Sequence, residues 1–451
     1  MVPSHFVVTP RKALSADALL ALLRKRFEQI PDARRDPDIS LADALMSGLA
    51  LFTLKDPSLL AFQERRLDEN MKRVFLIDQV PSDTRMREIL DPLDPQQLRP
   101  AFHDVFRQLQ RGKALEPFVF HQGCYLLSLD GTEYFSSTKV HCDYCLHKEN
   151  SKTGQVTYYH QMLGAVLVHP DLREVIPLAP EPIIQQDGTT KNDCERNAAK
   201  RLLRRTRQEH PHLKLIVVED GLASNAPHVR ELLDLKMHFI LGAKPADHEF
   251  LFAQVTAAFE AERVTTLEWT NEQGVRCEIA FVHGLPLNES NQDLLVNFLH
   301  YAEYDAEGHR QIYFTWITDL KITRQNARHL VRGGRARWKI ENETFNTLKN
   351  QGYQFEHNFG HGQQQLSVVL ALLMMLAFLV DQTQQLCCPL FRAVWHKLGS
   401  KRSLWEKVRS HFWHFQLRSL QHLYEAILYD LGRKLPLPGL YSAPLPAPDS
   451  S

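Results

Sequence analysis

Short apolar runs alternate with amphipathic segments of helical period between residues 119 and 242, and this alternation limits the fold more than any other feature of the sequence. A strand repeatedly followed by a helix is typical of an α/β sheet domain, because the helices cover the faces of the sheet. We therefore expect a mixed sheet flanked by helices. The predicted strands are 125–130, 156–159, 163–169, 174–178, 213–220 and 238–242, and the predicted helices are 193–208 and 223–235.

The regions on either side of this alternation have other patterns. Residues 1–118 contain short helices with basic starts, which form either a helix-turn-helix DNA-binding domain or a packing domain. Residues 119–360 form the expected sheet domain, with a β-rich insertion at about 245–310. A helical C-terminal region at 361–435 and a proline-rich disordered tail at 436–451 follow.

Seven cysteines in 451 residues are too few for a disulfide framework. The longest apolar run, Leu366 to Val380, has 15 residues, whereas a membrane span needs about 20. The first residues lack the basic-then-apolar pattern of a signal peptide. We expect a cytoplasmic protein with reduced thiols, no membrane association and a buried helix at 366–380.

The equal numbers of basic and acidic residues, 53 of each, conceal an uneven distribution. Residues 245–310 contain twelve acids, and only two basic residues precede Arg310 there. Residues 321–350 carry eight basic residues against two acids, and residues 191–207 carry seven against two. Two basic helices beside an acidic insertion suit a phosphate backbone as partner, with a solvated helix face as the alternative.

Two predicted strands end in an acid followed by glycine: Asp130 precedes Gly131 and Asp220 precedes Gly221. Ligands of open α/β sheets bind at such strand ends, although a lone aspartate there is often only a turn residue. A third acid, Glu341, lies within the basic helix. Carboxylates brought together repel one another, so such a group needs a cation.

Carboxylate oxygens select Mg²⁺ or Mn²⁺. Two such ions, about 3.5–4 Å apart, can stabilise both the attacking and the leaving oxygen of a phosphoryl displacement. The basic helices would then hold a polyanionic substrate. The residue pattern alone thus indicates metal-dependent chemistry on a nucleic acid.

Three motifs resemble the DDE-type transposases of bacterial insertion sequences, of the cut-and-paste kind. The first acid of that family lies in an apolar-Asp-Gly-Thr strand, matched by Asp130 in Leu-Ser-Leu-Asp-Gly-Thr. The second ends a strand before a helix, matched by Asp220 in Ile-Val-Val-Glu-Asp-Gly. The glutamate follows an Arg-x-Arg-Trp-x-Ile frame, matched by Glu341 after Arg335-Ala-Arg337-Trp-Lys-Ile. The resemblance covers roughly 120–360.

The resemblance implies a ribonuclease-H-like fold and an enzyme that cuts the ends of its insertion sequence and joins their 3′-hydroxyls to target DNA. It implies two Mg²⁺ or Mn²⁺ ions, with Asp130 bridging both and with Asp220 and Glu341 each holding one. Its DNA contacts would be Arg335, Arg337 and Lys349.

The implied partner is double-stranded DNA, as terminal inverted repeats and as target. Because two ends must be cut together, we expect a homodimer on DNA. The alternatives are a ribonuclease-H-like nuclease or resolvase, and an inactive DNA-binding protein on the same fold.

The chain departs from the family signature at two positions. Gly334 stands where the signature has tyrosine, and the signature lysine falls on Leu348, one residue before Lys349. One residue on an α-helix is a rotation of about 100°. Glu343, which has five residues between it and Lys349, is an alternative ligand, but we favour Glu341 because the Arg-Trp-x-Ile frame directly precedes it.

A second group of residues could bind metal. Cys142 and Cys145 form a Cys-x2-Cys pair, which is half of a zinc site. His160 and Cys194 could complete it if the fold brings them close. Two reduced thiols in a hairpin are the alternative, because no second Cys-x2-Cys pair follows.

Overall fold

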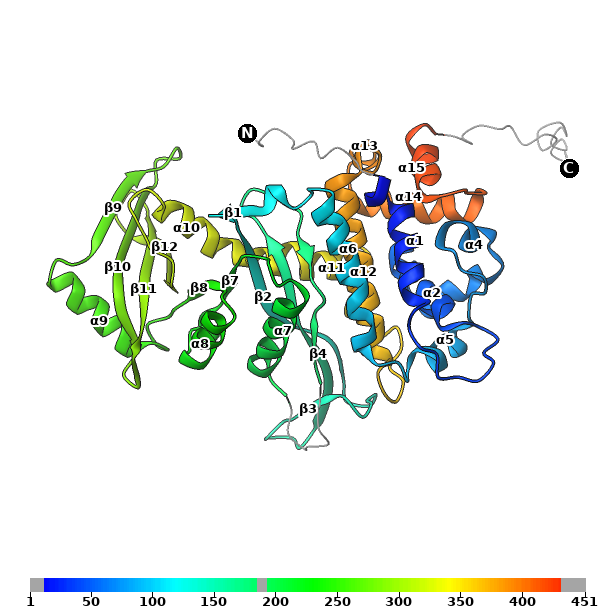
Figure 1. Ribbon diagram of the computed structural model, residues 1–451, viewed down its shortest axis with the longest axis horizontal. Coiled ribbons are helices and arrows are strands. Elements are labelled where there is room, and N and C mark those ends of the chain that lie inside the picture. Colours follow the sequence, from blue (N-terminus) through cyan, green and yellow to red (C-terminus); the bar gives the residue numbers. More distant parts are fainter. Residues whose placement is uncertain (1–11, 185–192, 431–451) are drawn as a thin grey trace, which may run out of the picture.

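The computed structural model describes residues 12–184 and 193–430 (Figure 1). The predicted disordered tail at 436–451 and Lys191 of the basic segment lie outside the described residues. Along the long axis, a strand-rich part lies at one end, the centre of the sheet in the middle, and a helical body at the other end.

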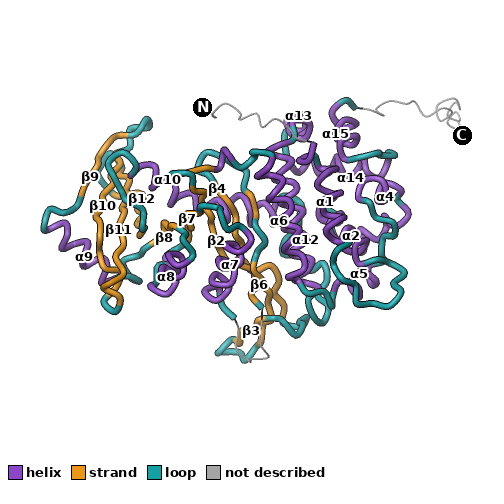
Figure 2. The backbone as a smooth tube through the Cα atoms, viewed as in Figure 1, coloured by secondary structure: helices purple, strands orange, loops and turns teal. Residues whose placement is uncertain are grey.

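The helical body combines helices from both ends of the chain (Figure 2). Its N-terminal helices are α1 (Ala16–Phe27), α2 (Leu41–Leu54), α3 (Leu59–Gln63), α4 (Glu69–Phe75), α5 (Asp83–Leu90) and α6 (Arg99–Arg111). Its C-terminal helices are α12 (Leu366–Cys387), α13 (Pro389–Leu398), α14 (Lys401–His414) and α15 (Leu420–Leu428). Several of them start at a serine that accepts a backbone hydrogen bond, as Ser15 does from Ala18 and Ser40 from Asp43.

The described strands form one twelve-stranded sheet. They are β1 (Val119–His121), β2 (Cys124–Ser137), β3 (Leu146–Glu149), β4 (Val156–Val168), β5 (Ile176–Pro177), β6 (Glu181–Ile183), β7 (Leu215–Glu219), β8 (His238–Gly242), β9 (Thr265–Thr270), β10 (Arg276–Asn288), β11 (Asn291–Tyr304) and β12 (Arg310–Thr318). The remaining helices are α7 (Glu195–Glu209), α8 (Ala226–Asp234), α9 (Glu249–Glu260), α10 (Ala327–Arg335) and α11 (Asn346–Asn350).

The sheet is mixed, in the order β3-β4-β2-β7-β8-β12-β11-β10-β9. Strands β2, β7 and β8 are parallel, and the pairs on both sides of them are antiparallel. Helices α7 and α8 lie against this central part. The mixed α/β fold predicted from the sequence is therefore confirmed, and it is consistent with the ribonuclease-H-like fold that the resemblance implies.

The β-rich insertion extends the central sheet. It begins with α9, and β9, β10 and β11 then add to β12, which pairs with β8. The chain therefore returns from the insertion within the same layer, along β12.

Two sequence predictions about the centre of the sheet are wrong. The strand predicted to end at Asp130 continues to Ser137, and the predicted strands 156–159 and 163–169 are one strand, β4. The two long strands support each other, because β2 pairs with β4 from Leu126 through Ser137. A long antiparallel partner lets a strand continue through polar residues that end an apolar run in the sequence.

Helix α12 is the buried helix expected at 366–380. It is long and apolar enough to cross a membrane by composition, but 94% of its most apolar window is buried inside the protein. The bent pair of helical segments 41–54 and 59–67 passes the same composition test only if taken as one span. Helix α12 packs along α2 and against α6, which makes it the core of the helical body.

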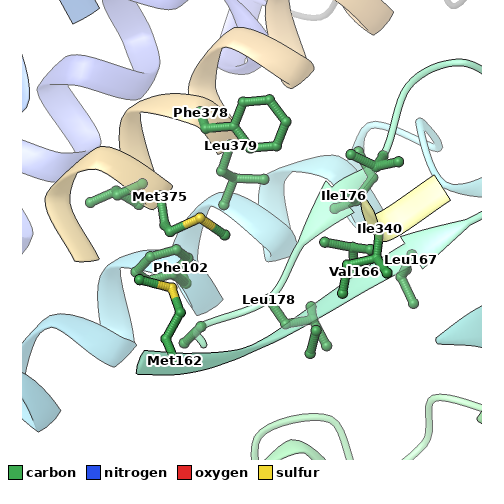
Figure 3. Close-up of a cluster of buried hydrophobic side chains, with 14 of the residues drawn as sticks. Phe102, Met162, Val166, Leu167, Ile176, Leu178, Ile340, Met375, Phe378 and Leu379 are labelled. Atoms are coloured by element: carbon green, nitrogen blue, oxygen red, sulfur yellow. The ribbon is translucent and has the colours of Figure 1, made fainter. Parts of the chain in front are cut away.

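A cluster of apolar side chains joins this helical body to the sheet (Figure 3). Phe378 and Met375 of α12 lie on one side of it, and Val166 of β4 lies on the other. Ile340 enters the same cluster and is fully buried. The residue before Glu341 is thus anchored in the core.

Candidate active site

Asp130 and Asp220 come from neighbouring parallel strands. Strands β2 and β7 are in register as far as Ser128 and Val218, and the same register continued by two residues sets Asp130 beside Asp220. Strand β7 ends at Glu219, whereas β2 runs on against β4. Asp130 therefore lies just beyond the point where β7 ends and β2 is paired with β4 alone. There it lines a groove of about 760 Å³, here called the Asp220 groove, to which Gln161, Glu195, Arg196, Lys200 and Asp220 also contribute.

Asp130 also lines a second groove of about 530 Å³, here called the Glu341 groove. Its other walls include Tyr134, Phe135, Glu341, Phe345 and Lys349. The structure thus brings the three predicted acids to two grooves that share Asp130.

Glu341 lies in a helical run whose winding changes along its length. Helix α10 continues into the 3-10 turn η6 (Ala336–Trp338), then the π-helical segment η7 (Ile340–Phe345), then α11. The Ser128 hydroxyl donates to the carbonyl of Arg337 at 3.0 Å. On β4, Gly164 stands opposite Asp130, and a Cβ there would lie 3.0 Å from the Phe345 ring. These close contacts dock the run on β2 and β4.

The π-helical segment accounts for the unusual spacing of Lys349. An i→i+5 turn holds one more residue than an α-helical turn, and such turns are frequent at functional sites. Glu341 precedes Lys349 by one residue more than in the family signature, and the part of η7 that follows Glu341 lies between them. Both side chains line the Glu341 groove. The extra residue is therefore absorbed without turning Lys349 away from Glu341.

Packing also explains the missing signature tyrosine. A Cβ at Gly334 would lie 2.6 Å from the indole of Trp316 on β12. At Gly333 a Cβ would lie 2.8 Å from the Phe120 ring. Helix α10 thus lies too close to the sheet for a large side chain at position 334.

The surroundings of Asp130 oppose its negative charge. Burial raises the pKa of Asp130 to about 6, and Glu195, Asp220 and Glu341 raise it as well, while Arg337 lowers it. The Arg337 guanidinium lies 3.7 Å from the Asp130 carboxylate, and the two side chains are 15% and 30% exposed. A carboxylate in this position favours a bound cation.

This raised pKa predicts how the stability of the metal-free protein depends on pH. Between its ordinary value of 3.8 and about 6, folded Asp130 keeps a proton that the unfolded chain has lost. Stability therefore falls as the pH rises through this window, by about 1–2 kcal/mol after allowance for solvent screening. We expect Asp130→Asn to raise the Tm at pH 8, without added divalent metal, and to leave it nearly unchanged at pH 4.

The control for this comparison is Asp247→Asn, which changes an exposed acid and should alter the Tm at neither pH. A Tm of Asp130→Asn below that of the wild type at pH 8 would show that the Asp130 carboxylate supports the fold.

Of the three basic residues expected at DNA, Lys349 lines the Glu341 groove and Arg337 lies beside Asp130. Arg337 points to Asp130 and stacks over the Trp338 ring at 4.6 Å, and Lys349 pairs with Glu356 at 2.7 Å. Arg335 faces the insertion, where it pairs with Glu303 at 3.2 Å. The DNA contacts of all three residues stay predictions.

In the basic helix α7, too, some basic side chains pair with acids and others line a groove. Arg201 and Arg205 pair with Glu181 at 2.8 and 2.7 Å, and Arg204 pairs with Glu231 at 2.6 Å. Arg196 and Lys200 line the Asp220 groove. Only part of the basic surplus is therefore directed at the site.

Glu195 is a site residue that the sequence did not reveal. Its carboxylate accepts a hydrogen bond from Gln161 at 2.5 Å, and it lies so near Gly131 that a Cβ there would be 2.2 Å away. Burial raises the pKa of Glu195, and nearby Asp220 raises it further. No local pattern marks this residue, because only the packing of α7 on the sheet brings it to Asp130.

Glu343 lies on another side of the helical run. Burial lowers the pKa of Lys339 and of Lys401, and Glu343 partly offsets this for both. Its electrostatic partners are therefore these two lysines, whereas Glu341 acts on Asp130.

The donor chemistry of the three acids fits hard divalent cations, since it offers only carboxylate oxygens. A second group of side chains that could hold a metal ion, with sulfur and nitrogen donors, occurs elsewhere in the described residues. The ligand atoms of Cys142, Cys145, His160 and His361 all lie within 4.8 Å of one another. The fourth ligand expected there, Cys194, is exposed at the start of α7 and is absent from this cluster, so that prediction is wrong.

A family model described as Transposase DDE domain matches residues 143–379. The match spans more than half of the 451 residues, includes Asp220 and Glu341, and begins after Asp130. No curated protein matches the chain. From the family match, together with the mixed sheet and the grouping of acids, we conclude that the chain belongs to the family of DDE-type transposases.

Proposed function

We propose that this transposase cuts the ends of its insertion sequence and joins the freed 3′-hydroxyls to target DNA. The observation that carries the proposal is the position of Asp130, which shares one groove with Asp220 and another with Glu341. A DNA strand lying across both grooves would place its scissile phosphate against all three acids.

Asp130, Asp220 and Glu341 would hold two Mg²⁺ or Mn²⁺ ions, with Asp130 shared between them. When bound, these ions would activate the attacking oxygen and stabilise the leaving oxygen of a phosphoryl displacement. A bound cation would also offset the burial and the repulsion from neighbouring carboxylates, which together raise the pKa of Asp130. The attacking groups are water and then the DNA 3′-hydroxyl, so no side-chain nucleophile is required.

The basic residues at the two grooves would hold the phosphate backbone. Arg337 is suited to a bidentate contact with a phosphate close to Asp130, and Lys349 would bind as a point charge beside Glu341. Arg196 and Lys200 line the Asp220 groove and would continue this contact along the strand. We place the reaction in the cytoplasm and expect two copies of the chain to act together on two DNA ends.

A cleavage and strand-transfer assay tests this proposal. The substrate is a duplex carrying the terminal inverted repeats that flank the gene, incubated with the full chain and Mg²⁺ or Mn²⁺. We expect nicks at the repeat ends that leave 3′-hydroxyls, and then joined products with a target plasmid. Calcium should support binding without cleavage, because its loose coordination does not organise an in-line displacement. Cleavage without any joined product would instead indicate a nuclease.

A second prediction concerns the groove charges. The affinity for DNA falls as salt rises, and Lys200→Gln should make the slope of log affinity against log salt less steep by about 0.9, because one fewer counterion is released on DNA binding. The matched control is Arg204→Gln on the same helix, since Arg204 pairs with Glu231 and should leave the slope unchanged. Fluorescence anisotropy of a labelled terminal duplex at several salt concentrations measures both. Equal slopes for Lys200→Gln and the wild type would show that DNA does not contact Lys200 in the Asp220 groove.

A further inference from the structure

Four side chains outside the acidic site converge from three separate segments. Cys142 and Cys145 lie in the loop after β2, His160 lies on β4, and His361 lies in the loop before α12. The nearest imidazole nitrogens lie 3.3 Å from the Cys142 sulfur and 3.2 Å from the Cys145 sulfur. All four residues are buried, with exposed fractions of 7%, 3%, 0% and 5% in chain order.

From this cluster we propose a structural zinc site with two cysteine and two histidine ligands. The sulfur–sulfur and sulfur–nitrogen contacts of 3.2–3.7 Å are close to the separations that a tetrahedral zinc ion imposes. Zinc bonds of about 2.3 Å to sulfur and 2.0–2.1 Å to nitrogen place two sulfurs about 3.8 Å apart, and a sulfur and a nitrogen about 3.5 Å apart. The two sulfurs here lie 3.7 Å apart, and His160 Nε2 lies 3.5 Å from the Cys145 sulfur.

The chemistry of the ligands selects zinc over the ions of the acidic site. Two thiolates and two imidazoles in a tetrahedral set are typical of Zn²⁺, whereas Mg²⁺ and Mn²⁺ prefer oxygen. Two thiolates also cancel the two positive charges of the ion, so a buried site carries no net charge. All four positions are filled by protein, which is the arrangement of a structural zinc rather than a catalytic one.

The surroundings hold the ligands in place. The Tyr134 ring stacks on His160 with an interplanar angle of 11°, and the Phe135 ring lies 4.2 Å from that of His361. The loop carrying His361 is fixed by Asp91, whose carboxylate accepts from the amides of Gln363 and Leu366 at 2.9 and 3.1 Å. These contacts orient both histidine rings and anchor the loop that carries His361.

The position of the site indicates its role. It joins the strand that carries Asp130, the neighbouring strand β4, and the segment that follows the Glu341 helix. Tyr134 and Phe135, which contact the ligands, also line the Glu341 groove. A zinc ion here would hold one wall of that groove against the sheet.

Metal analysis of the full chain, purified without chelators or a metal-affinity tag, tests the proposal independently of DNA cleavage. We expect one zinc ion per chain in the wild type and in the control variants Cys194→Ser and His357→Asn, which change an exposed cysteine and an exposed histidine. Cys145→Ser and His361→Asn should lose the bound zinc. Full zinc content in Cys145→Ser, or none in the wild type even after expression with added zinc, would overturn the proposal.

X-ray absorption at the zinc edge keeps the test decisive if the ligand variants do not fold, because it needs only the wild type. The proposal predicts two sulfur neighbours at about 2.3 Å and two nitrogen neighbours at about 2.0–2.1 Å. A shell of oxygen and nitrogen alone would place the zinc elsewhere, for example on the acids of the grooves, and would contradict the assignment.

Discussion

Glu341→Gln is expected to reduce strand cleavage at least about a thousandfold, which corresponds to a barrier higher by about 4 kcal/mol. The amide keeps the size of the side chain but removes the charge that would hold a divalent cation. Because Ile340 anchors the helical run in the core, the variant should fold normally and bind DNA. The measurement is the cleavage rate of the terminal duplex under single-turnover conditions with Mg²⁺.

Glu343→Gln is the matched control, since it makes the same change two residues away. Glu343 acts on Lys339 and Lys401, whereas Glu341 lines the groove with Asp130. We expect Glu343→Gln to cleave within a few-fold of the wild type, and Asp130→Asn and Asp220→Asn to be as inactive as Glu341→Gln. If Glu343→Gln were inactive and Glu341→Gln active, Glu343 and not Glu341 would be the metal ligand.

Asp381→Asn is expected to lower the free energy of unfolding by about 3–5 kcal/mol, because it would leave a buried charge without its partner. The Lys55 ammonium lies 2.6 Å from the Asp381 carboxylate, and the Lys55 side chain is fully buried. Tyr353 also donates to Asp381, and the Lys55 ammonium lies 3.9 Å from the centre of the Tyr353 ring. This network joins α2 to α12, the two central helices of the helical body.

Urea denaturation followed by circular dichroism measures the effect. Glu406→Gln is the control, because Arg402 and Glu406 form an exposed pair on α14, which is worth a few tenths of a kcal/mol at most. The double variant Lys55→Met with Asp381→Leu should recover much of the loss, since it removes both charges. A midpoint for Asp381→Asn equal to that of Glu406→Gln would mean that Lys55 does not need its partner.

Local periodicity sufficed to predict most of the central sheet. The apolar run of β7 and the strand–helix order were visible in the sequence, because each buried strand of a parallel pair is apolar throughout. The end of β2 could not be predicted in this way. Its second half is polar and aromatic, and only the length of its partner β4 determines how far it runs.

Candidate site residues could be predicted where a local sequence motif marks them, and not where only the fold brings distant residues together. The Arg-Trp-x-Ile-Glu frame pointed to Glu341, and the structure places it beside Asp130. The sequence could not identify Glu195 or His361 as members of these sites. His361 contacts Cys145, which is 216 positions away in the sequence. Glu195 reaches Asp130 only through the packing of α7 on the sheet. The basic segments predicted DNA contacts by charge alone, but charge does not show that Arg335 pairs with the insertion.

Our proposal requires that Asp130, Asp220 and Glu341 together bind the ions that take part in DNA cleavage. Anomalous scattering from Mn²⁺ in crystals of the full chain with its terminal duplex tests this most directly. We expect two peaks, one touching Asp130 and Asp220 and the other touching Asp130 and Glu341. Duplex bound in the grooves with manganese at other residues, such as Glu343, and none at these three acids would contradict it.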